Sequence, residues 1–247
     1  MIRGLYSAAS GLLVQACRSD VIAANLANAS VPGYRRDIPT VSTFGRALEY
    51  AGATLAAGPS GQAMALLPST RVDLAPGSLR ETGRDLDLAL DGPGYFCVQT
   101  PAGEAYTRSG AFRLDTSHRL VTVSGHPVVG QAGAISVTGT DLKILENGDV
   151  FADGARVDRL KLVDLPAGAL ITKLGDGLLK PAPGNSTGAT PSVLSRVRQR
   201  YLENANVNAV AELAAMISTL RAFEASQRAL LANDQTLDKA INEIGRV

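Results

Sequence analysis

Residues 20–36 read DVIAANLANASVPGYRR, and this stretch decides how the chain begins. Its first half continues a helical pattern that starts near Ile2. Its second half holds short polar side chains that compete for backbone hydrogen bonds, and Pro32 followed by Gly33 is a turn dipeptide. We therefore expect a helix from Ile2 to just beyond Leu26, followed by an abrupt change of chain direction.

The first helix carries a narrow apolar seam. Alternating steps of three and four residues from Ile2 give eight positions, of which seven are apolar. This spacing is typical of a coiled-coil helix and not of the wider face of a globular one. The positions are Ile2, Leu5, Ala9, Leu12, Ala16, Ser19, Ala23 and Leu26.

A second long helix is predicted at the other end, from about Asn208 to Ile244. Asn208 suits the N-cap and Glu212 the first turn, and neither Gly nor Pro occurs between Ala209 and Glu243. The same count gives ten positions, of which eight are apolar: Leu213, Met216, Leu220, Phe223, Gln227, Leu230, Asp234, Leu237, Ile241 and Ile244.

These two seams can pair, because closing a long loop costs only about 0.6 kcal/mol for each doubling of its length. An ordinary helical hairpin that caps a globular domain is the alternative. The small residues of the first seam favour dense packing among many copies, since they bury too little area to hold a single pair firmly.

The middle of the chain has the pattern of β-structure. Leu86, Leu88 and Leu90 alternate with acidic residues, and short apolar runs follow between Gly-rich turns. Asn147-Gly148 and Asp153-Gly154 are the strongest hairpin turns, because both pairs accept positive φ angles. The fold class is therefore α+β: paired terminal coiled-coil helices as one module, and a central antiparallel all-β domain.

The predicted boundaries are 1–35 with 203–247 for the helical module, and 71–202 for the β domain with its return segment. Residues 36–70 are rich in Ala, Gly and Ser and are predicted to be an extended connector. Residues 165–192 are predicted to be a surface loop with a short strand at 178–180.

Composition narrows the function. The 247 residues carry a formal charge of +1, which favours neither nucleic acid nor an acidic membrane surface as partner. Aromatic residues make up 4% and Trp is absent, so the anchors of a compact small-molecule site are few. No run approaches the roughly 20 apolar residues of a membrane span.

Four features of the sequence are candidates for a chemical site. Asp85, Asp87 and Asp91 surround a β segment and could be the carboxylates of a glycoside hydrolase acting on murein, but we expect Asp85 and Asp87 on a polar strand face. The run LLVQAC ending at Cys17 resembles a lipoprotein cleavage site, although the helical seam continues through it. Cys17 and Cys97 have different settings and are not expected to pair, and the isolated His118 and His126 have no metal-ligand spacing. We predict no enzyme, cofactor or metal.

Three separated segments resemble the axial proteins of the bacterial flagellum, specifically the basal-body rod proteins. They are MIRGLYSAASGL with DVIAANLANASVPGYRR, the central GSLRETGRDLDLALDGPGYFCVQTPAGEAYTRSGAFRLD, and LENANVNAVAEL with LRAFEASQRALLANDQTLDKAIN. They occur in the family's order and at its chain positions. Within the family the proximal-rod type is the most similar, and the distal-rod or hook type is the alternative.

The resemblance implies a structural subunit that assembles through its terminal helices into a hollow tube and transmits motor torque to the hook and filament. It implies a location in the rod across the periplasm, and export by the flagellar type III apparatus without a cleaved signal. Other copies of the chain and other rod proteins are the implied partners, with no nucleic acid, no small-molecule substrate and no membrane span. The expected assembly residues are Leu5, Leu12, Ala16, Ala23, Asn25, Leu26, Asn28, Gly33, Tyr34, Asn206, Val207, Leu213, Met216, Leu220, Phe223, Leu230 and Leu237; among them Asn25, Asn28, Gly33 and Tyr34 are to fix the exit of the first helix.

Overall fold

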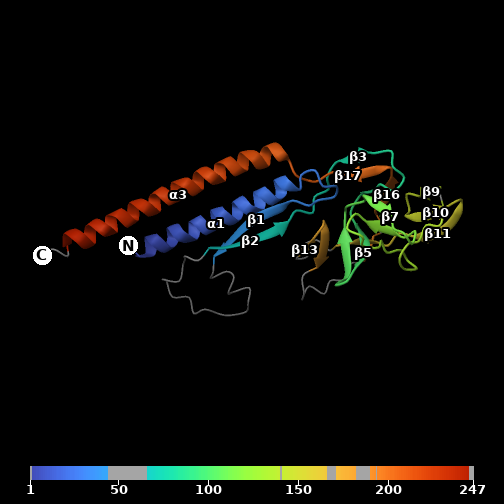
Figure 1. Ribbon diagram of the computed structural model, residues 1–247, viewed down its shortest axis with the longest axis horizontal. Coiled ribbons are helices and arrows are strands. Elements are labelled where there is room, and N and C mark those ends of the chain that lie inside the picture. The colour runs from blue at the N-terminus through green and yellow to red at the C-terminus, as the bar shows by residue number, and fades with distance from the viewer. Residues whose placement is uncertain are drawn as a thin grey trace. The chain divides into compact units, whose positions relative to one another are not determined.

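The computed structural model describes residues 2–43, 66–139, 141–165, 171–181, 190–192 and 194–244. The chain divides into two compact units. The terminal unit comprises Met1–Ala27, Asp37–Arg71 and Asn208–Val247, and the central unit comprises Asn28–Arg36 and Val72–Val207. Two helices and a central body of antiparallel strands confirm the predicted α+β class (Figure 1).

The terminal unit contains the two helices found among the described residues. α1 (Ile2–Ala27) lies against α3 (Ala209–Ile244), and the two run in opposite directions (Figure 1). The predicted N-cap is confirmed, because Asn208 Oδ1 accepts hydrogen bonds from the backbone N–H groups of Val210 and Ala211, each at 3.1 Å. The predicted helix ends are correct to within a residue or two at the described termini.

The segment predicted as an extended connector contains paired strands. β1 (Asp37–Thr43) and β2 (Leu66–Val72) form a two-stranded sheet, and Thr40 Oγ1 lies 2.7 Å from Ser69 Oγ across it. Four of the seven residues of β1 are β-branched, which suits a strand: Ile38, Thr40, Val41 and Thr43. The remainder of the predicted connector, 44–65, lies outside the described residues.

The largest sheet of the central unit has six strands in the order β13-β14-β6-β5-β12-β15. Its pairs are antiparallel, and β5 with β6 forms a hairpin in which Phe96 opposes Thr107 and Thr100 opposes Gly103. The strands are β5 (Tyr95–Thr100), β6 (Gly103–Thr107), β12 (Leu162–Asp164), β13 (Ile171–Gly175), β14 (Leu178–Pro181) and β15 (Thr190–Pro191).

Smaller sheets complete the central unit. β9 (Leu142–Ile144), β10 (Asp149–Ala152) and β11 (Ala155–Arg159) form a meander whose two turns are the predicted Asn147-Gly148 and Asp153-Gly154, with Asp153 at φ 48°. The other pairs are β3 (Leu79–Glu81) with β17 (Tyr201–Glu203), β4 (Leu88–Asp91) with β16 (Arg196–Gln199), and β7 (Phe112–Leu114) with β8 (Leu120–Thr122).

Two of the short apolar runs do not form regular strands. The runs 126–129 and 134–137 make only isolated bridges, such as Val98 to Val128, although Val128, Ile135 and Val137 are buried. The short strand predicted at 178–180 is confirmed as β14. The predicted surface loop 165–192 also contributes β13 and β15, which pair with β14 and β12.

The core of the central unit is aliphatic with two aromatic rings. Phe96 and Phe112 meet edge to face with ring centroids 5.2 Å apart. Leu88, Leu120, Val98 and Val150 are fully enclosed around them. This core gives the unit a stable body on which the segments adjoining both helices are held.

Candidate assembly site

The two helices bury one face each. On α3 the enclosed positions are Glu212 and Thr219, with Met216 and Phe223 half-buried beside them. On α1 the enclosed positions are Val21, Ile22 and Asn25. The spacing of three and four residues on both faces is the pattern expected of two helices in lengthwise contact.

The predicted seam residues therefore separate into two sets. Leu12, Leu26, Met216, Phe223 and Leu230 are at least half-buried in the chain, whereas Ala16, Ala23, Leu213 and Leu220 are exposed. Burial in the single chain therefore divides the predicted seam residues, and the pairing of the two helices through one seam stays a prediction. The side chains of Leu5 and Leu237 lie outside those described, and the role of both sets in assembly stays a prediction.

Asn25 secures the strand that follows α1. Its Nδ2 donates to the backbone carbonyl of Asp37 at 2.8 Å, and its Oδ1 accepts from the Asp37 N–H at 2.9 Å. The amide is fully buried, so both bonds are shielded from water. Asn25 therefore joins α1 to the start of β1 within the terminal unit.

The central unit holds the turn that follows α1 through a buried ionic cluster, here called the junction cluster: Arg35, Arg108 and Glu203. Glu203 Oε1 lies 2.7 Å from Arg35 Nη1, and its Oε2 lies 3.2 Å from Arg108 Nη1. All three side chains are at most 4% exposed. A carboxylate thus bridges two guanidinium groups in the interior.

Backbone groups surround the junction cluster. Arg35 Nη1 also donates to the carbonyl of Ala75 at 2.7 Å, Arg108 Nη2 donates to that of Gly92 at 2.7 Å, and Gly77 N–H donates to Glu203 Oε1 at 2.7 Å. Burial lowers the pKa of the Arg108 guanidinium, and the Glu203 carboxylate opposes that shift. The cluster therefore ties the loop after α1 to four separate parts of the β-structure.

Gly33 and Tyr34 lie in the same arrangement. Gly33 has φ 69° and donates from its N–H to the Glu203 carbonyl at 2.7 Å, and a Cβ here would strike the backbone of Arg108 and Ser109. Tyr34 is buried, with Lys173 Nζ 4.0 Å from its ring centroid. These contacts explain physically why this turn needs Gly and Tyr.

Asn206 ties together three backbone segments of the central unit. Its Oδ1 accepts from the Arg36 N–H at 2.6 Å, and its Nδ2 donates to the carbonyls of Asp73 at 3.1 Å and Ala75 at 2.9 Å. Asn28 and Val207, predicted with it, are half-buried. The sequence predicted a role for Asn206 but none for the junction cluster. The only sequence signal for the cluster is that Arg35 and Glu203 are charged residues among apolar and turn residues.

The carboxylates of Asp85, Asp87 and Asp91 have structural partners. Asp85 pairs with Arg200 at 2.7 Å, Asp91 pairs with Arg198 at 2.7 Å, and Asp87 is 1% exposed with Arg84 at 3.5 Å. The prediction of Asp87 on a polar face is wrong, because Asp87 turns inward where its N–H donates to Arg84 and its carbonyl accepts from Arg200. Arg198 lies on β16, the strand paired with β4, and Arg200 follows directly after it.

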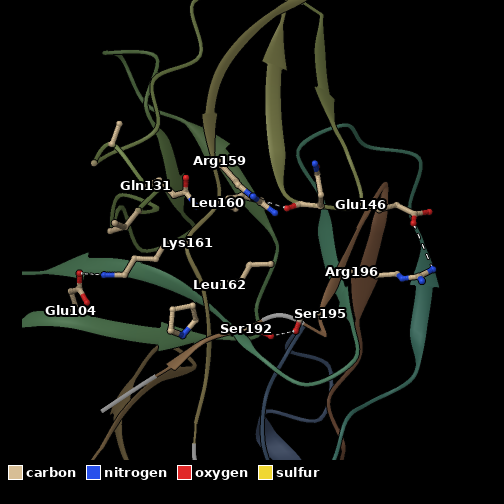
Figure 2. A pocket seen from close by; sticks show the side chains of 16 residues that line it. Glu104, Gln131, Glu146, Arg159, Leu160, Lys161, Leu162, Ser192, Ser195 and Arg196 are labelled. Atoms are coloured by element: carbon tan, nitrogen blue, oxygen red, sulfur yellow. Dashed lines mark hydrogen bonds and ion pairs between the residues drawn. The ribbon is translucent and has the colours of Figure 1, made fainter.

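A cleft of about 1000 Å³ lies in the central unit (Figure 2). Glu104 pairs with Lys161 at 2.6 Å, Glu146 pairs with Arg196 at 3.8 Å, and the hydroxyls of Ser192 and Ser195 are 2.7 Å apart (Figure 2). Both acids at this cleft are thus paired with cations.

Both cysteines are free thiols. Cys97 is fully buried, and burial with the neighbouring Glu104 raises the pKa of its thiol to about 11. Among the described residues no group of three or more His, Cys, Asp or Glu could hold a metal ion. Within the described part of the chain no helix has the length and hydropathy of a membrane span.

Three family models match the chain in order. "Flagella basal body rod protein" matches residues 5–35, "Flagellar hook protein FlgE/F/G D1 domain" matches 89–152, and "Flagellar basal body rod FlgEFG protein C-terminal" matches 198–243. The outer two cover α1 with its turn and α3 with β17, and the middle one covers part of the β core.

Curated relatives match over nearly their full length. The flagellar basal-body rod protein FlgF of Escherichia coli K12 is 32% identical, with 97% of each chain covered. FlgF of Salmonella typhimurium is 31% identical, with 97% of each chain covered, and FlgG of Bacillus subtilis is 30% identical, with 98% of this chain and 99% of the relative covered.

A two-helix terminal unit joined to an antiparallel β body, with these matches, defines an axial protein of the flagellum. The chain belongs to the family of flagellar basal-body rod proteins. It is a structural protein of that rod, as predicted, and not an enzyme, because the relatives and family models are those of rod and hook proteins.

Proposed function

We propose that this chain is a subunit of the proximal part of the flagellar rod and assembles there through its terminal helices. The observation that carries the proposal is the pair α1–α3, which leaves a second apolar face on α3 exposed in the single chain. An exposed apolar helix face of this length is typical of a contact that another molecule covers.

In the assembled rod, the terminal helices pack side by side as a coiled-coil layer around a lumen, and residues 71–202 form the outer body. Other copies and other rod proteins are the neighbours. Torque from the motor passes through the stacked subunits to the hook and filament, because the junction cluster fixes the segments next to both helices in the β body.

The subunit reaches the periplasm through the flagellar type III export apparatus, without cleavage of a signal. The first helix has small residues along its seam, and the contact residues of α3 are mostly half-buried. A helix pair held by so few contacts opens readily, which suits passage through an export channel. Replacing Cys17 with Ser should leave the mass and location of the protein unchanged, which mass spectrometry and fractionation would check against lipidation.

The distal-rod type is the second candidate, because several of the matching relatives are FlgG proteins. Deleting the gene and imaging purified basal bodies by electron microscopy tests both. Rings with an absent or very short rod and no hook are expected for the proximal type, whereas a long truncated rod would favour the distal type. Complete rods and hooks would overturn the proposed function.

A further inference from the structure

One carboxylate of the six-stranded sheet has a buried oxygen that receives no hydrogen bond. Asp164 is the last residue of β12, and its Oδ1 is enclosed by protein. Among the described residues no N–H or O–H group donates to this oxygen. Burying a polar atom without a hydrogen-bond partner costs free energy, so native proteins rarely leave one without a partner of some kind. The oxygen therefore marks a place where something other than the chain itself can bind.

Two hydroxyl groups lie around the same place. Ser192 Oγ and Ser195 Oγ are 2.7 Å apart at one end of the cleft in the central unit (Figure 2). A Cβ built on Gly94 would lie 2.4 Å from Ser195 Oγ and 3.1 Å from both Ser192 Oγ and Asp164 Oδ1. Three oxygen atoms from separate segments thus surround the space in front of the Gly94 Cα.

Strand register explains how these groups come together. β12 pairs with β5 on one side and with β15 on the other. Continuing the β5–β12 register by one residue places Gly94 opposite Asp164, and the Ser192 N–H donates to the Leu162 carbonyl at 2.9 Å. Residues two apart on a strand share a face, so Asp164 lies on the face of Leu162, which lines the cleft.

Gly94 keeps this space open. Its φ of 121° is a conformation that favours glycine, and a side chain here would meet Ser195 Oγ at 2.4 Å. The carbonyl of the preceding Pro93 lies 3.5 Å from Ser192 Oγ and adds a fourth oxygen nearby. We call this arrangement the oxygen cradle: Asp164 Oδ1, Ser192 Oγ, Ser195 Oγ and the Pro93 carbonyl around Gly94.

The atoms of the oxygen cradle are ligands for a hard cation. Carboxylate, hydroxyl and carbonyl oxygens suit Ca²⁺ and Mg²⁺, whereas zinc sites use mainly nitrogen and sulfur. The ligands come from three separated segments and only one of them is acidic. This is why the sequence predicted no metal.

The spacing of the two hydroxyls favours calcium over magnesium. Oxygens 2.7 Å apart that each lie about 2.4 Å from an ion subtend about 70° at it, close to the roughly 72° between equatorial ligands of a seven-coordinate calcium. At the distance of about 2.1 Å that magnesium requires, the same oxygens would subtend about 80°, whereas an octahedron needs about 90°.

We propose that the oxygen cradle binds a calcium ion. The Asp164 carboxylate supplies the negative charge, the hydroxyls of Ser192 and Ser195 supply neutral ligands, and water from the open cleft completes the coordination. One carboxylate gives a weak site, so we expect a Kd of about 1 mM. Bound calcium ties Ser192 and Ser195, which precede β16, to the end of β12. The site does not depend on the proposed function.

Thermal unfolding of the full chain, freed of metal with a chelator and measured at constant ionic strength, tests the site. In the parent, 10 mM calcium chloride should shift the unfolding equilibrium about tenfold towards the folded state. Asp164→Asn should abolish this shift. Without calcium this variant should be at least as stable as the parent, because it removes a buried carboxylate oxygen that has no partner. A carboxylate needed only for folding would give a loss of stability instead.

Two further variants complete the test. Ser195→Ala removes one neutral ligand and should reduce the calcium shift to less than about half. Glu146→Gln is the matched control, because Glu146 lines the same cleft but pairs with Arg196, and it should keep the whole shift.

Three outcomes would overturn the calcium site. The first is an equal calcium shift in the parent and in Asp164→Asn. The second is no shift in the parent up to 10 mM calcium, which would mean that water alone occupies the oxygen cradle. The third is a magnesium shift as large as that of calcium. Each of these results leaves the proposed function standing, since imaging of basal bodies tests that separately.

Discussion

At the scale of single residues, the buried charges of the junction cluster matter more than the surface ion pairs. Two guanidinium groups share one carboxylate in the interior, and each also bonds to backbone carbonyls. Removing one partner of a buried pair leaves uncompensated charge, which costs more than the pair contributes by itself. Glu203 is the critical member, because it is the anion between two cations.

Glu203→Gln should lower the free energy of unfolding of the central unit by about 3–5 kcal/mol. The control is Glu146→Gln, because Glu146 is 76% exposed in its pair with Arg196 and should cost less than about 1 kcal/mol. Urea denaturation followed by circular dichroism measures both. Similar losses for the two variants would show that the junction cluster does not hold the fold.

The buried thiol of Cys97 should lower the free energy of unfolding at alkaline pH. Its pKa is about 11 in the folded chain against 9.0 for an exposed thiol. Between these values the unfolded chain has lost the proton that the folded chain retains. The free energy of unfolding therefore falls as pH rises through this window, by up to about 3 kcal/mol, and the contribution is complete below pH 9.

Thermal melts of the parent and of Cys97→Ala at pH 8, 9 and 10 check this. The variant has a lower melting temperature at pH 8 because a small cavity forms, but its slope against pH should be shallower. Burial also raises the pKa of Tyr95 and Tyr106, so part of the slope remains in the variant. Parallel slopes would contradict the assignment to Cys97.

At the scale of elements, helix ends and hairpin turns were predictable because local chemistry sets them. The N-cap Asn208 and the turns Asn147-Gly148 and Asp153-Gly154 are where the sequence indicated. The face that α3 turns to α1 was not predictable from the seam alone, since α3 has two apolar stripes and the pattern does not say which one α1 covers. The junction cluster also could not be predicted, because it joins residues from remote segments.

Phe223→Ala should weaken the contact between α1 and α3 by about 1–2 kcal/mol, because the ring is half-buried in the single chain. Leu220→Ala is the matched control, because Leu220 is 46% exposed in the single chain, and it should leave the isolated chain nearly unchanged. Hydrogen exchange of the α3 amides in the monomer measures the difference. Faster exchange in Leu220→Ala than in Phe223→Ala would contradict the two-face description of α3.

At the scale of the whole molecule, the two units differ in how much apolar surface they bury. Among the described residues, the buried apolar side chains of the helical pair are Val21 and Ile22, whereas the central unit encloses a large cluster around Phe96 and Phe112. A segment with few buried contacts opens at low free energy. The domain boundaries predicted from sequence at residues 35, 70 and 202 remain predictions. The division into compact units places Asn28–Arg36 with the central unit.

The amides of α1 and α3 should therefore exchange with solvent at least about a hundredfold faster than those of β5 and β6 in the monomer, which corresponds to a difference of about 2.7 kcal/mol in opening free energy. Hydrogen exchange with mass spectrometry on the full chain measures this. On incorporation into basal bodies the helices should become protected. Equal protection of both units in the monomer would show that the chain opens as a single cooperative body.

The bond from the Arg36 N–H to Asn206 joins residues 170 positions apart in sequence, and α1 with α3 spans a similar separation. Contacts between residues so far apart in sequence form late in folding, because the long loop between them must close first. The strands of the β core all precede residue 206, so the core can form first. The contacts between the two ends of the chain need residue 206 and α3 as well. The contacts between the two ends of the chain are therefore expected to be the last native contacts to form.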